Sequence, residues 1–149
     1  MAVYKSILVA IDLSAEAEQV LQAAADIAEA NRSIISIIHV TDSPISPYSQ
    51  WSDYVVPLSE NQIRENLFKR LAALVEEVGL SKSLITIDFG RAIDVIVDKA
   101  ESEQADLIVI GSHGRHGIKA LLGSTANGVL HHANCDVLSV RVREVIDQI

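Results

Sequence analysis

Five short apolar runs alternate with four amphipathic segments along this chain, and this alternation restricts the fold more than any other feature of the sequence. The runs lie at residues 4–12, 33–40, 84–89, 105–111 and 135–142. They are nearly continuous stretches of Ile, Val, Leu and Ala, which is typical of parallel strands buried on both faces. Between them apolar residues recur at helical spacing. The series predicts an α/β fold, an open five-stranded parallel sheet with helices on both faces.

Three helix boundaries are marked by capping residues. Ser14 follows the first run and is the predicted N-cap of the first helix. Ser59 and Gln62 have the spacing of a capping box at the start of the second helix, and Gly79 is its predicted C-terminal stop. The sequence therefore gives a start for two helices and an end for one.

Size and charge limit the number of domains and the kinds of partner. The chain has 149 residues, which favours one domain over residues 1–149. Its formal net charge of −8 and the lack of a basic run argue against a nucleic-acid partner and against an anionic membrane surface. The single cysteine, Cys135, cannot form an intrachain disulfide, and we expect neither a secretory leader nor a long apolar span. We expect a cytoplasmic protein.

Strand order decides where a ligand would bind. Five parallel strands commonly take the order 2-1-3-4-5 or 3-2-1-4-5, and the hydrophobic pattern alone does not choose between them. Asp12 ends the first run and Gly111 ends the fourth. Only the order 3-2-1-4-5 makes those two strands neighbours with the switch point between them, so we expect this order and a ligand at this edge of the sheet.

The segment between residues 109 and 129 has the composition of a phosphate-binding loop. It holds five of the seven glycines. Gly111 and Gly114 lack a Cβ, so their backbone N–H groups can approach a ligand closely. Gly123, Ser124 and Thr125 open the fourth helix, where free N–H donors and a partial positive charge suit an anion. Basic or imidazole side chains raise the local potential: His113, Arg115, His116 and Lys119.

Simpler interpretations of these residues stay open. The segment is neither a Walker A loop nor a G-x-G-x-x-G fingerprint, and its glycines could serve turns only. The pairs His113/His116 and His131/His132 have metal-like spacing, but no Cys or carboxylate joins them, so no metal site is expected there. No G-x-S-x-G motif indicates a hydrolase. The long connection at 41–58 holds Trp51 and Tyr54, which either cover the ligand or cover core.

Four stretches of the sequence resemble the universal stress protein family. They are ILVAIDLS at 7–14, IIHV at 37–40, ADLIVIGSHGR at 105–115 and LLGSTANGVLHHANCDVLSVR at 121–141. The resemblance covers almost the whole chain. It implies the adenine nucleotide alpha hydrolase-like fold with strand order 3-2-1-4-5, and a stress-response protein.

The nucleotide-binding branch of the family carries G-x2-G-x9-G-[ST] after the fourth strand. The resemblance implies that ATP phosphates and ribose lie on this loop, that Asp12 lies beside the phosphates or a bound Mg²⁺, and that the Val40 backbone holds adenine. The predicted nucleotide-binding residues are Ala10, Ile11, Asp12, Val40, Gly111, Ser112, His113, Gly114, Arg115, Gly123, Ser124 and Thr125.

The loop departs from this motif, because eight residues rather than nine separate Gly114 from Gly123. The branch that resembles UspA itself lacks the glycine motif and is regarded as not binding ATP. The stretch AIDLS resembles that branch, whereas GSHGR and GST resemble the binding branch. We interpret the chain as an adenine-nucleotide-binding module or switch with at most slow hydrolysis. The alternatives are a dimeric, UspA-like interaction protein that binds no nucleotide, and an enzyme, for which no nucleophile and base are evident.

The last apolar run predicts a subunit interface. In the order 3-2-1-4-5 the fifth strand lies at the edge of the sheet, and an uncovered apolar edge tends to pair with another chain. The family usually dimerises. We therefore expect a homodimer through Val137 to Val142.

Overall fold

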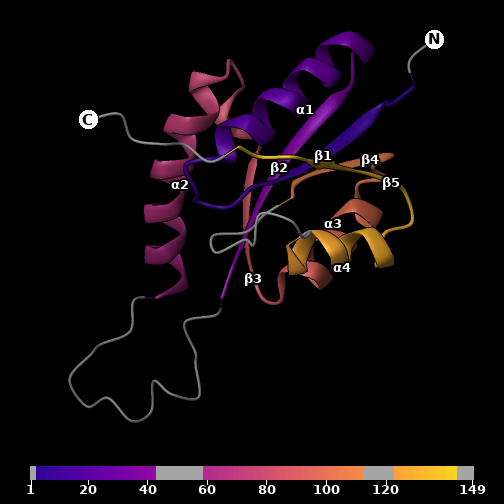
Figure 1. Cartoon of the computed structure of the whole chain (residues 1–149). Coiled ribbons are helices and arrows are strands. Elements are labelled where there is room, and N and C mark those ends of the chain that lie inside the picture. The colour runs from indigo at the N-terminus through magenta and orange to yellow at the C-terminus, as the bar shows by residue number, and fades with distance from the viewer. Residues whose placement is uncertain (1–2, 43–58, 113–122, 144–149) are drawn as a thin grey trace.

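A computed structural model describes residues 3–42, 59–112 and 123–143 of the chain. The elements are β1 (Ser6–Ala10), α1 (Ala17–Asn31), β2 (Ile34–Thr41), α2 (Glu60–Glu77), the 3-10 turn η2 (Lys82–Leu84), β3 (Ile85–Phe89), α3 (Ala92–Ser102), β4 (Leu107–Gly111), α4 (Ser124–His132) and β5 (Asp136–Val140). All neighbouring strands are parallel, in the order β3-β2-β1-β4-β5 (Figure 1). The predicted fold class and strand order are confirmed.

The sheet lies between two helical layers, with α1 and α2 on one face and α3 and α4 on the other (Figure 1). Val9 faces the first layer and Leu8 faces the second, and both are fully buried. Burial on both faces is the physical reason why the central strands read as continuous apolar runs. Among the helices of the described ranges, none is long and apolar enough to cross a membrane.

The start of α1 differs from the prediction. Ser14 does not cap the helix: its backbone N–H and its hydroxyl both donate to Asp12 Oδ1, at 2.9 Å and 2.5 Å. The hydroxyl is therefore used in a local turn, as Asp and Ser side chains often are. The helix begins at Ala17, with Glu16 at the N-cap position and no side-chain capping bond.

Both boundaries predicted for α2 are confirmed. The Ser59 hydroxyl accepts from Gln62 N at 3.2 Å, and the Gln62 side chain accepts from Ser59 N at 3.0 Å, so the capping box is complete. Gly79, just past the helix, has φ of +82°. This left-handed conformation costs glycine least, which explains why the helix ends there.

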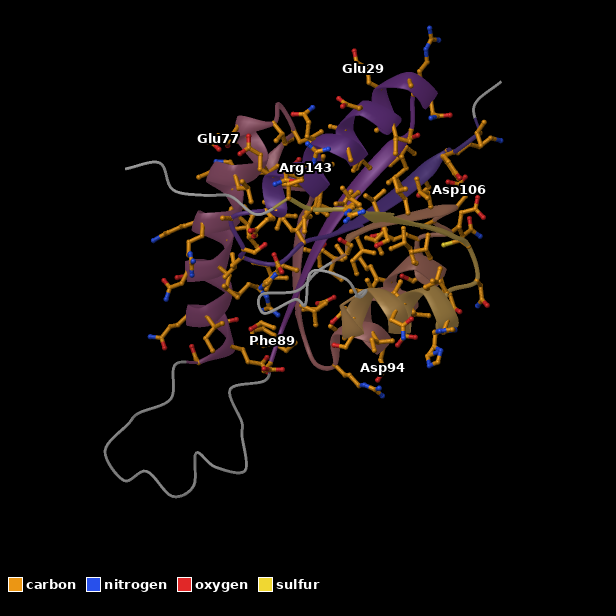
Figure 2. The ribbon with its side chains drawn as sticks, viewed as in Figure 1. Glu29, Glu77, Phe89, Asp94, Asp106 and Arg143 are labelled. Carbon is orange, nitrogen blue, oxygen red and sulfur yellow. The ribbon has the colours of Figure 1, made fainter. Side chains whose placement is uncertain are left out.

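Polar contacts join the amino ends of β1 and β4 near Asp106, which is labelled in Figure 2. The Asp106 carboxylate accepts from Lys5 N at 2.9 Å and from Ser6 N at 3.1 Å. Cys135 lies at the same end, partly buried. Burial raises the pKa of the Cys135 thiol, and the charges of Asp136 and Asp106 raise it further. A thiol with a raised pKa is a poor nucleophile at neutral pH, which fits a packing role for Cys135.

Candidate functional site

A cavity of about 200 Å³ lies where β1, β2 and β4 end. Its floor is made by the last residues of these strands and by those that follow β1. They are Ala10, Ile11, Asp12, Ile38, Val40, Ile110 and Gly111. Because β1 and β4 are neighbours whose crossovers leave in opposite directions, this is the switch point at which open α/β sheets bind ligands.

Most of the predicted nucleotide-binding residues come together here. Eight of the twelve line the cavity: Ala10, Ile11, Asp12, Val40, Gly111, Gly123, Ser124 and Thr125. Three more, His113, Gly114 and Arg115, lie outside the described residues, as do Trp51 and Tyr54 of the long connection.

The twelfth residue, Ser112, holds the backbone around the cavity instead of lining it. It is 7% exposed. Its N–H donates to Val140 O at 2.8 Å, its carbonyl accepts from Gly123 N at 2.5 Å, and its hydroxyl accepts from Val142 N at 3.3 Å. One residue therefore joins the end of β4, the start of α4 and the exit of β5.

Three helices begin at this cavity, and none has a side-chain N-cap. The N-cap residues of α1, α3 and α4 are Glu16, Arg91 and Gly123, and no side-chain capping bond forms at any of them. The first residue of each helix lines the cavity: Ala17, Ala92 and Ser124. The start of α2, which has a full capping box, does not line it. The helices that face the cavity thus keep the positive ends of their dipoles uncapped by side chains, which favours an anion.

The first turn of α4 contributes three consecutive residues with backbone N–H groups to the cavity lining. Gly123 N already donates to Ser112 O, and the first intrahelical bond runs from Asn127 N to Gly123 O at 3.0 Å. The N–H groups of Ser124, Thr125 and Ala126 come before that bond, and all three residues line the cavity. These are the donors that an α-helix leaves for a cap or a ligand.

Acidic side chains also face the cavity. Asp12 is half-buried, and both of its hydrogen bonds from Ser14 end on Oδ1. Glu16, at the start of α1, lines the cavity as well. Carboxylates beside an anion site favour a ligand that brings a cation with it.

A buried histidine fixes the end of β1 against β2. His39 is 7% exposed, and its Nδ1 lies 2.8 Å from Ile11 O. Because a carbonyl oxygen only accepts, Nδ1 carries the proton. His39 directly precedes Val40, so the contact joins the strand ends that carry Val40 and Asp12. No pattern in the sequence indicated this role.

Eight apolar residues of the cavity lining were missed as site residues because their pattern is that of core. They are Ala17, Val20, Ile38, Ala92, Ile96, Ile110, Ala126 and Val142. Helical or strand periodicity identifies such residues only as inward-facing. An apolar body with a few polar groups at one end is the usual form of a small-molecule site.

Comparison with known sequences identifies the family. The sequence model of the universal stress protein family matches residues 3–141. The chain belongs to the universal stress protein family. Universal stress protein A homolog 1 of Coxiella burnetii is 36% identical over 144 residues, which cover 95% of this chain and 99% of that protein. The predicted family membership is confirmed.

Several solved structures share the fold. The hypothetical protein MJ0577 has a TM-score of 0.73 at 27% identity, with 95% of this chain and 99% of that chain covered. A universal stress protein in complex with cAMP has a TM-score of 0.64 at 23% identity, covering 93% and 97%. The Archaeoglobus fulgidus universal stress protein in complex with dAMP has a TM-score of 0.60 at 24% identity, covering 96% and 100%.

Proposed function

We propose that this universal stress protein binds an adenine nucleotide in the cavity at the ends of β1, β2 and β4, and acts as a binding module or switch. The observation that carries the proposal is the first turn of α4. Its N–H donors belong to Ser124, Thr125 and Ala126, which line a cavity with apolar walls. Oriented backbone donors at a helix N-terminus suit a phosphate, and the apolar walls suit a flat base.

Adenine would lie at the β2 end of the cavity. Val40 is the last residue of β2 that lines the cavity, and Ala92 and Ile96 of α3 also line it. The backbone of Val40 would supply the polar contacts to the base. The structural neighbours that hold cAMP and dAMP support an adenine monophosphate as the shared part of the ligand.

A magnesium ion would reach the site with the nucleotide. Mg²⁺ is usually bound by one or two carboxylates together with substrate phosphates and water. The residues present fit this arrangement, because Asp12 faces the cavity while its two local hydrogen bonds use only Oδ1. Asp12 would hold the ion, which would offset the phosphate charge beside Glu16.

Binding is tested by calorimetric titration of the purified protein with ATP and Mg²⁺, ADP, AMP and adenosine. We expect saturable heat for the phosphorylated ligands, and weaker binding of ATP after chelation of the metal. Adenosine is expected to bind more weakly than AMP, because it lacks the group that α4 holds. The absence of heat with every adenine compound would contradict the proposal and favour the UspA-like interaction protein.

We also propose a homodimer through β5. This strand lies at the edge of the sheet, and Leu138 in its middle is 37% exposed. The sequence placed the interface on Val137 to Val142, whereas the strand itself ends at Val140. Light scattering at micromolar protein is expected to give twice the chain mass of 16.1 kDa. Leu138→Asp is expected to give the monomer mass, and a monomer without the substitution would refute the dimer.

A further inference from the structure

The segment after β5 crosses from the sheet edge to α1 and is fastened there by one side chain. Gln19 Nε2 donates to Arg143 O at 2.7 Å, and Arg143 N donates to Gln19 Oε1 at 2.8 Å. The Gln19 amide thus pairs with the Arg143 backbone as a neighbouring strand would. Figure 2 shows Arg143 beside the first turns of α1.

The Gln19–Arg143 contact helps to position Val142, a residue that lines the cavity. Val142 lies one position before Arg143 and is one of the residues that line the cavity. Its N–H donates to the Ser112 hydroxyl at 3.3 Å. Val142 is therefore held from two directions, by Ser112 at the end of β4 and by Gln19 through Arg143.

We propose that Gln19 is a positioning residue of the nucleotide site. It keeps residues 141–143 across the α1 side of the cavity, so that Val142 closes this wall around the ligand and slows its release. The inference rests on the proposed nucleotide binding and adds to it the residue that controls exchange.

The Gln19–Arg143 hydrogen bonds can break without unfolding of the core. Both Gln19–Arg143 bonds are exposed to solvent, where water can take the place of either partner when a bond opens. The wall beyond β5 can therefore open locally while the buried strands stay intact. Each opening would remove the contact of Val142 with the bound nucleotide, and the ligand could leave.

Stopped-flow displacement of a fluorescent mant-ATP·Mg²⁺ complex by excess ATP tests the proposal. Gln19→Ala is expected to raise the dissociation rate about tenfold, since two hydrogen bonds are lost. Gln22→Ala is the matched control, because Gln22 lies on the same helix and, within the described part of the chain, its side-chain hydrogen bond is to Asp26, at 2.9 Å. Its dissociation rate is expected to equal that of the unmodified protein.

Two further variants separate positioning from general destabilisation. Gln19→Glu keeps an acceptor for Arg143 N and loses the donor, so an intermediate rate is expected. Gln19→Ala is expected to have little further effect in a Val142→Ala background, because both changes act on the same wall. Equal rates for Gln19→Ala and Gln22→Ala, or additive effects with Val142→Ala, would overturn the inference. Absence of mant-ATP binding to the unmodified protein would refute the proposed function, and the inference with it.

Discussion

Replacement of Ser124 by aspartate is expected to weaken ATP binding about 100-fold while it stabilises the fold. Ser124 is the first residue of α4, is exposed, and lines the cavity. A carboxylate here would repel the phosphates, and a loss of about 2.7 kcal/mol corresponds to this factor. The same carboxylate would interact favourably with the helix dipole, which contributes about 0.3–1 kcal/mol to folding. Titration calorimetry and thermal unfolding measure the two effects, which have opposite signs.

Two comparisons make the Ser124→Asp result specific. Ser124→Asn has a similar size without the charge, so its ATP affinity is expected to stay within a few-fold of the unmodified protein. Adenosine has no phosphate, so Ser124→Asp should leave its affinity unchanged. An equal loss for adenosine and ATP would mean that the substitution distorts the cavity, and the phosphate would then have to lie elsewhere.

The strand order was predictable because polar and glycine residues end particular strands. Asp12 and Gly111 indicated that β1 and β4 are neighbours, and the sheet confirms it. The boundaries of α2 were predictable for a similar reason, since a capping box and a terminal glycine act through local geometry. The prediction that Ser14 caps α1 was wrong because a helix cap and a local turn both use its hydroxyl. The hydroxyl donates to Asp12, two residues earlier, and so forms the turn.

The contacts that shape the cavity could not be predicted in the same way. Gln19 meets Arg143 across 124 residues of sequence, and His39 meets Ile11 across 28. Neither pair has a periodic or local signal. The uncapped start of α4 was foreseen only as a glycine followed by hydroxyl residues. Only the structure shows that the Gly123 N–H donates to Ser112 O. The N–H donors at the start of α4 are therefore those of the next three residues.

Gly128→Ala is expected to destabilise the fold by about 1–2 kcal/mol, although alanine is the better helix former. Gly128 lies within α4, where the change to alanine would by itself gain about 0.5–1 kcal/mol. A Cβ at this position would overlap Ile93 Cδ1 and lie 2.8 Å from Ile93 Cγ1. The β-branched Ile93 side chain adapts poorly, and overpacking costs about 1–3 kcal/mol. Chemical denaturation of the variant measures the balance.

The double variant Gly128→Ala with Ile93→Ala identifies the cause. Ile93→Ala removes the atoms that a Cβ would meet, so the alanine at 128 should then stabilise the protein instead of destabilising it. Because α3 and α4 both begin at the cavity, with Ala92 and Ser124 in its lining, the single variant should also weaken nucleotide binding as the two helices move apart. A destabilisation that persists in the double variant would show that the close approach of α3 and α4 does not depend on this contact.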